Sequence, residues 1–219
     1  MFSRSRDAVS LPVSAILAAY RRGLFPMADP GDGSLGWYEA DPRGVIPLAA
    51  FHAPRRLRRY MKAFEFASDR DFEGVIDGCA RPLTWISDEL REMYARLHRA
   101  GHAHSVEAWK DGRLAGGLYG VQVGGAFMAE SMFHAVPNAS GACLVRLVEH
   151  LRARAFVLLD IQQVLPNTAR YGAVEIPRAE FRRRLAAALD LRPSWGTLTS
   201  SRPGRGSGRG EDPGRSGSR

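Results

Sequence analysis

The stretch that decides the fold is HSVEAWKDGRLAGGLYGVQVGGAFMAESMF, residues 104–133. It consists of apolar and aromatic runs divided by turn residues, which predicts three strands over 104–109, 113–123 and 126–133. Lys110-Asp111-Gly112 and Gly124-Gly125 separate these strands and are typical hairpin turns. Since hairpins join neighbouring strands, the sequence predicts an antiparallel sheet at the centre of the chain.

Helical patterns flank these strands on both sides. A helix is predicted over 141–154, where apolar residues recur at helical spacing, and the strongly apolar run 156–161 is typical of a buried strand. Further helices are predicted over 13–23, 54–63, 71–80, 87–100 and 178–189. Ser87 is a good N-cap for the fourth of these, and Gly101 ends it.

The order of helix, antiparallel strands, long helix, buried strand and helix predicts an α+β layered domain. This order resembles the acetyltransferase-like fold of the GCN5-related N-acetyltransferase type, in which an acyl donor enters where the central strands splay. The turn-rich residues 25–44 place a boundary near Asp41-Pro42. We therefore expect a small N-terminal domain over 1–41, a catalytic domain over 42–195, and a disordered Gly/Ser/Arg/Pro tail over 196–219.

Composition favours a basic protein with a nucleic-acid partner. The 219 residues carry a formal net charge of +8, and of the 31 basic residues all but Lys62 and Lys110 are arginine, the better bidentate ligand for phosphate. Cys79 and Cys143 form no disulfide framework, which favours a reducing compartment. No apolar run reaches the ~20 residues of a membrane span. We expect a cytoplasmic protein with no membrane partner.

A basic helix is the first candidate site. Arg55, Arg58, Arg59 and Lys62 fall on one face at helical spacing. Such a face suits a phosphate backbone, although a solvated basic helix shows the same pattern.

Asp160 and Gln162 are the second candidates, because they end an apolar strand and share one of its faces. A carboxylate there can be a tuned general base, an ion-pair partner or a helix cap. Glu130 is the third, an acid among apolar residues whose burial would be costly if unpaired. A regular strand would point Glu130 and Met132 to one side and Ser131 and Phe133 to the other.

Several other chemistries find little support. His102 and His104 lack a third ligand, so we expect no metal. Residues 136–142 lack the Gly-rich loop that holds a pyrophosphate in acetyl-CoA enzymes of this fold. A CoA-dependent acyltransferase is therefore disfavoured, and a non-catalytic RNA-binding module remains an alternative.

Short motifs in a fixed order add a resemblance over roughly residues 14–181. They are AYRRGLFP (19–26), DPRG (41–44), GCA (78–80), TWI (84–86), GHAHSVE (101–107), GGLYG (116–120), ESMF (130–133), NAS (138–140), DIQ (160–162) and EIPR (175–178). Together they resemble the leucyl/phenylalanyl-tRNA–protein transferases. Met27 stands where that family commonly has Trp, and Asn167 where His is common.

The resemblance implies transfer of leucine, phenylalanine or methionine from aminoacyl-tRNA to a protein N-terminus, typically Lys or Arg, creating an N-degron, without a cofactor and by a monomer. It places Asp160 and Gln162 at a proton relay and Glu130 beside the reacting amine or the donor. Leu118, Phe127 and Met132 would line the side-chain pocket, Tyr20, Trp85 and Tyr94 would flank the terminal adenosine, and the basic helix would hold tRNA.

Overall fold

The computed structural model describes residues 11–29, 34–80 and 86–198. Within them the helices are α1 (Val13–Arg21), α2 (Arg55–Met61), α3 (Phe72–Cys79), α4 (Asp88–Arg99), α5 (Ala139–Ala153), α6 (Pro166–Ala169) and α7 (Arg178–Leu189). The strands are β1 (Phe25–Ala28), β2 (Leu35–Tyr38), β3 (Arg43–Val45), β4 (Glu65–Ser68), β5 (Ala103–Lys110), β6 (Arg113–Val123), β7 (Ala126–His134), β8 (Leu158–Gln162) and β9 (Val174–Ile176).

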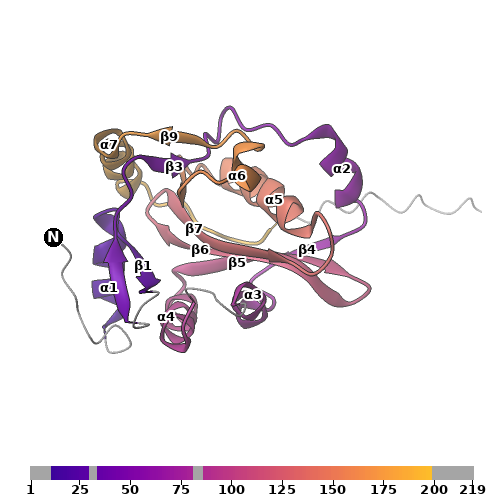
Figure 1. Cartoon of the computed structure of the whole chain (residues 1–219), viewed down its shortest axis with the longest axis horizontal. Helices are drawn as coiled ribbons and strands as arrows, with labels where there is room; N and C mark the ends of the chain where they lie inside the picture. Colours follow the sequence, from indigo (N-terminus) through magenta and orange to yellow (C-terminus); the bar gives the residue numbers. More distant parts are fainter. Residues whose placement is uncertain (1–10, 30–33, 81–85, 199–219) are drawn as a thin grey trace, which may run out of the picture.

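A seven-stranded sheet in the order β4-β5-β6-β7-β8-β3-β9 forms the middle layer. Its neighbouring strands are antiparallel except β7 and β8, which are parallel. Figure 1 shows α2, α5 and α6 on one side of the sheet and α3 and α4 on the other. β1 and β2 form a separate small sheet. The chain is thus a mixed α+β protein with a small N-terminal part.

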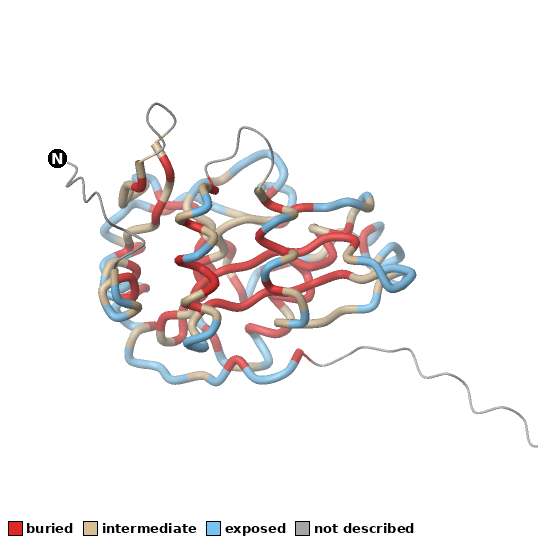
Figure 2. The backbone as a smooth tube through the Cα atoms, turned by 90° about the horizontal axis from the view of Figure 1, so that it is seen from below, coloured by how far each residue is buried: buried red, intermediate tan, exposed pale blue. Residues whose placement is uncertain are grey.

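Two apolar clusters lie on the two faces of the sheet, and Figure 2 shows these buried segments running through the centre of the molecule. On the α5 face, Leu147, Val148 and Leu151 are fully buried, each contributing about 1.5–3 kcal/mol. On the other face, Met93 and Leu97 of α4 are equally buried. The helical spacing of these side chains explains why α4 and α5 were predictable.

The pairing of β7 with β8 ends early, which opens the sheet. The two strands pair from Ala126↔Leu158 to Met128↔Asp160. Beyond that point β7 continues against β6 alone, and β8 continues against β3. The space where they separate therefore lies next to Glu130 and Gln162, two residues further along each strand.

The structure confirms the three central strands and the helices flanking them, with the strand over 113–123 and the helix over 178–189 matching to the residue. The sequence did not predict β1, β2, β3, β4, β9 or α6, which have only three or four residues each. Chain packing also continues past the expected end at Trp195, because the Leu198 side chain is buried in the α5-side cluster. No described helix has the length and apolarity that crossing a membrane requires.

Candidate functional site

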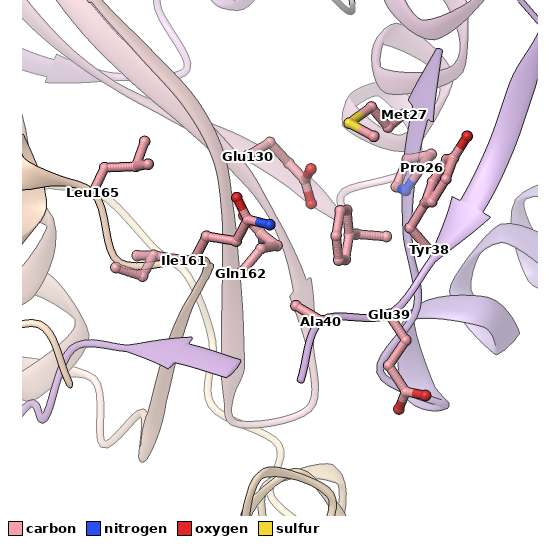
Figure 3. Close-up of a pocket in the computed structure, with 11 residues that line it drawn as sticks. Pro26, Met27, Tyr38, Glu39, Ala40, Glu130, Ile161, Gln162 and Leu165 are labelled. Atoms are coloured by element: carbon pink, nitrogen blue, oxygen red, sulfur yellow. The ribbon is translucent and has the colours of Figure 1, made fainter. Parts of the chain in front are cut away.

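A pocket of about 290 Å³ opens beside the separated ends of β7 and β8 (Figure 3). Most of its wall is apolar and comes from the small sheet and from the end of β8. The lining residues are Phe25, Pro26, Met27, Tyr38, Glu39, Ala40, Glu130, Ile161, Gln162, Gln163 and Leu165. Figure 3 shows Glu130 and Gln162 pointing into the same space, whereas Glu39 points away from it. An apolar pocket with a few convergent polar groups is the usual form of a small-ligand site.

A β-bulge gives Glu130 its direction. Tyr119 pairs with Ser131 and the next residue, Gly120, pairs with Ala129, so Glu130 is an extra residue in β7. Its carboxylate consequently lies on the α4 side of the sheet, while Met132 packs in the α5-side cluster. The expectation that Glu130 and Met132 share a face was wrong, because the bulge breaks the alternation of the strand.

Two buried tyrosines hold the Glu130 carboxylate. The Tyr20 and Tyr94 hydroxyls each donate to one of its oxygens at 2.9 Å. Burial raises the pKa of Glu130 to about 7, against the opposing effect of these two hydrogen bonds. Burial also raises the pKa of both tyrosines well above 10, so they remain donors. Glu130 can therefore exchange a proton near neutral pH.

Asp160 has a different environment. It is fully buried, and Arg43, 1 % exposed, donates to it from Nε and Nη2 at 2.7 Å each. Gln162 supplies two more hydrogen bonds, from its backbone N–H at 3.1 Å and from Nε2 at 3.2 Å. Four donors occupy the four lone-pair positions of the carboxylate. Asp160 is thus a fixed anchor in an ion pair, one of the alternatives that the sequence left open.

The anchor sets the orientation of Gln162. The amide nitrogen donates to Asp160, which ties the side-chain amide to the anchor. The backbone of Gln162 is in the left-handed region, at φ 56°, a strained conformation for a residue other than glycine. Strain of this kind is concentrated at functional sites, where the surrounding structure enforces it.

The predicted side-chain pocket residues lie elsewhere. Leu118 and Phe127 are 2 % and 0 % exposed inside the α5-side cluster, and Met132 packs against that cluster. None of the three lines the Glu130 pocket. They stay a prediction for the side-chain pocket, now placed on the α5 side of the sheet.

Tyr20 and Tyr94 do reach the site, through Glu130, but their rings are buried and present no face for stacking on a base. Trp85 lies outside the described residues. Arg55, Arg58, Arg59 and Lys62 are all exposed on or just after α2, on the side of the sheet that carries α5 (Figure 1). The structure therefore separates the basic helix from the tyrosine and carboxylate cluster.

Sequence reasoning missed Arg43 and the apolar wall of β1. Arg43 also donates to the Gly23 carbonyl at 2.9 Å and lies over the rings of Phe25 and Phe181 at 4.9 and 4.4 Å. The sequence did hold a signal for this ion pair. Arg43 stands close to the apolar run 45–48 and Asp160 ends an apolar strand, so burial of both charges was to be expected. A buried arginine and a buried carboxylate each need a partner of opposite charge. Among the described residues no cluster of three potential metal ligands occurs.

Comparison with known proteins agrees with the motifs. Residues 45–186 match the family described as leucyl/phenylalanyl-tRNA protein transferase, and residues 10–41 match the N-terminal domain of that family. The leucyl/phenylalanyl-tRNA–protein transferase of Rubrobacter xylanophilus is 56 % identical over 180 residues, covering 80 % of this chain and 94 % of that protein. Those of Salinibacter ruber and Nitrobacter winogradskyi are 47 % and 46 % identical, covering 85 % and 92 % of this chain and 84 % and 93 % of their own lengths.

Among solved structures, L-PGS from Bacillus licheniformis aligns with a TM-score of 0.38 and 10 % identity, over 72 % of this chain and 50 % of that one. That likeness is too weak to carry an argument. The sequence matches are strong and span both parts of the molecule. The chain belongs to the leucyl/phenylalanyl-tRNA–protein transferase family, whose members are aminoacyltransferases.

Proposed function

We propose that this protein transfers leucine or phenylalanine, with methionine as a third donor, from aminoacyl-tRNA to the N-terminal residue of acceptor proteins. Membership of the family supports the reaction class. The observation that carries the proposal is that Glu130 and Gln162 line the same largely apolar pocket. Lys and Arg as acceptor termini, an N-degron as product, a cytoplasmic location and a monomeric state are the parts of the proposal that rest on the family resemblance.

The chemistry needs one proton acceptor and good positioning. The donor ester is already activated, so attack of the acceptor amine on the ester carbonyl forms the C–N bond directly. The C–O bond to the ribose then breaks, and the leaving oxygen takes a proton. An α-amine has a pKa of about 8, so it must lose a proton before or during attack. Glu130, with a pKa of about 7, suits acceptance of that proton and its return to the leaving oxygen.

Gln162 and its anchor position the amine in this proposal. The Gln162 amide oxygen accepts a hydrogen bond from the attacking nitrogen and aligns it with the ester. Asp160 and Arg43 act through Gln162 and do not touch substrate. Holding the amine and the ester in the reactive orientation can lower the barrier by several kcal/mol. Proton transfer by a positioned side chain can raise the rate by a further factor of about 10²–10⁴.

The apolar wall suits the donor side chain. Phe25, Met27 and Ile161 surround a space of about 290 Å³. Such a wall favours Leu, Phe and Met over polar residues, with modest discrimination among the three because a methylene is worth only about 1–3 kcal/mol. We place the donor side chain here, in place of the wall of Leu118, Phe127 and Met132 suggested by the resemblance.

The separated ends of β7 and β8 support an acetyltransferase-like architecture, in which the acyl group enters between two parallel strands that diverge. The exposed cations Arg55, Arg58, Arg59 and Lys62 support binding of the tRNA backbone by α2.

The direct test is transfer of labelled leucine and phenylalanine from charged tRNA to peptides beginning with Arg, Lys, Asp or Glu. Labelled product with Arg and Lys peptides is the expected result. Glu130→Gln keeps the size of the side chain but replaces one acceptor oxygen with a donor nitrogen and removes the titrating proton site, so it should bind tRNA normally and transfer at least 100-fold more slowly. If folded wild-type protein binds tRNA but labels no peptide, the transferase proposal fails for this chain.

A further inference from the structure

A second cavity, which shares no lining residue with the Glu130 pocket, lies on the side of the sheet that carries α5. Its volume is about 530 Å³. It is lined by Pro54, Arg56, Leu57, Tyr60, Asn138, Arg170 and Tyr171, which belong to α2, to the start of α5 and to the residues just after α6. We call it the α2–α6 cleft. None of the residues assigned above to catalysis, to the donor pocket or to the basic face of α2 lines it.

The cleft has an apolar floor and a cationic rim. Leu57 and Tyr171 are 6 % and 2 % exposed and form the floor, whereas Arg56, Tyr60 and Arg170 are exposed. Gly141 makes room for the floor, since a Cβ there would lie 2.1 Å from the Tyr171 hydroxyl oxygen. Tyr60 presents an accessible ring at 40 % exposure, which the two buried tyrosines of the Glu130 site do not.

The two rim arginines are held in place by aromatic rings. The Arg56 guanidinium lies 5.9 Å from the Tyr60 ring centre. The Arg170 guanidinium lies 4.9 Å from the Tyr171 ring centre and donates to its hydroxyl at 3.1 Å. No acidic side chain belongs to the lining, and among the described residues neither guanidinium forms an ion pair. Apart from the bond from Arg170 to Tyr171, their donors are available to an anion outside the protein.

We propose that the α2–α6 cleft binds single-stranded RNA near the 3′ end of the donor tRNA. Arg56 and Arg170 contact phosphates, and a nucleobase stacks on Tyr60. Cations that follow a backbone beside an exposed aromatic ring are the usual elements of single-strand recognition, and unpaired bases are what proteins read in RNA. The proposal rests on the proposed function. It adds Arg56, Tyr60 and Arg170 to the RNA-binding residues already proposed on the basic face of α2.

The position of the cleft relative to the Glu130 pocket fits this partner. Leu165 lines the pocket and Arg170 lines the cleft, and only α6 stands between them in the chain. Four helical residues rise about 6 Å. A strand whose terminal aminoacyl ester lies in the pocket can therefore pass over α6 and place its upstream phosphates in the cleft.

The test uses the full-length protein with two donors: charged tRNA, and phenylalanine esterified to adenosine alone, which has no upstream phosphates. The variants are Arg56→Gln, Arg170→Gln and Tyr60→Ala. The control is Arg99→Gln, which removes an exposed arginine from α4 on the opposite face of the sheet. Thermal unfolding checks that each variant is folded.

With charged tRNA, Tyr60→Ala should raise the donor KM by about 5- to 100-fold, the effect of losing one stacked base. Each arginine variant should lower the salt dependence of tRNA binding by about 0.7 in log–log slope. The control should change neither, and all variants should use the adenosine ester like wild type. Unchanged donor KM and salt slope in the variants, or a rise confined to the acceptor KM, would overturn the cleft proposal. Absence of transfer from both donors by the wild type would instead sink the transferase function itself.

Discussion

Replacement of Arg43 by methionine removes the charge from the buried anchor while keeping much of the side-chain length. In the folded protein Asp160 then loses two hydrogen bonds of 2.7 Å and its only buried counter-ion among the described residues. The Gly23 carbonyl also loses its 2.9 Å donor. Leaving one member of a buried ion pair without its partner costs about 3–5 kcal/mol. Since small proteins unfold at about 5–15 kcal/mol, we expect a large fraction of the stability to disappear.

The companion variant separates the charge from the packing. Asp160→Asn alone leaves the Arg43 guanidinium buried without a counter-ion and should also cost about 3 kcal/mol or more. The double variant Arg43→Met with Asp160→Asn contains neither charge. Its loss of stability should be smaller than the sum of the two single losses by at least about 2 kcal/mol, the coupling energy expected of contacting charged groups.

Urea unfolding at pH 7, followed by tryptophan fluorescence and by circular dichroism, measures all four proteins of the cycle. Agreement of the two signals establishes that each transition is two-state. The reasoning would be refuted by single-variant losses below about 1 kcal/mol, or by losses that add without coupling. Either result would mean that the ion pair does not hold β3 against β8, and the orientation of Gln162 would need another cause.

Three further changes test the site. The pKa of Glu130 is raised to about 7 from an ordinary 4.5, so the folded state binds this proton more tightly than the unfolded state. The free energy of unfolding should therefore fall as pH rises from about 4.5 to 7, by at most about 3 kcal/mol. Denaturant unfolding measured across that range should show no such fall in Glu130→Gln. The same ionisation predicts that single-turnover transfer by wild type rises with pH through about 7, a step that should be absent in Glu130→Gln. Met27→Trp adds bulk to the pocket wall, so a donor competition assay should show kcat/KM falling more for phenylalanine than for leucine. Equal falls for both donors would contradict the placement of Met27 beside the donor side chain. Gly44→Ala places a Cβ 2.6 Å from the carbonyl carbon of Gln163. Thermal unfolding should show a decrease of about 1–3 kcal/mol in the free energy of unfolding. An unchanged midpoint would contradict the close approach of β3 to the end of β8.

The central strands and the long helices were predictable because each carries its own periodicity. Residues 113–123 form a largely apolar run bounded by turn residues, and α4 has both a capping serine and an apolar stripe. β3 and β9 have three residues each, which is too short for any period to emerge. They join the sheet because residues far away in the chain supply their hydrogen-bonding partners.

The same distinction between local and distant information governs the site. Asp160, Gln162 and Glu130 were identifiable as polar residues in apolar surroundings. Their roles were not, because Arg43 lies 117 positions from Asp160 in the chain, and the bulge at Glu130 depends on how β6 pairs. The predicted wall of Leu118, Phe127 and Met132 stays a prediction, because these residues lie in or against the α5-side cluster and not beside Glu130. Apolar residues of a core strand and of a pocket look alike in the sequence.

The two carboxylates of the site are divided by their partners. Glu130 is held by two neutral hydroxyls, which can donate to the carboxylate but carry no charge to fix it in the ionised form. Asp160 is held by a guanidinium that cannot be deprotonated in a protein. A proton can therefore come and go at Glu130 with little rearrangement, whereas Asp160 is tied at two points to Arg43 and also holds Gln162. Environments that separate paired acids in this way usually separate their roles, and on that ground we propose proton transfer at Glu130 and orientation of the amine by the Asp160–Gln162 pair.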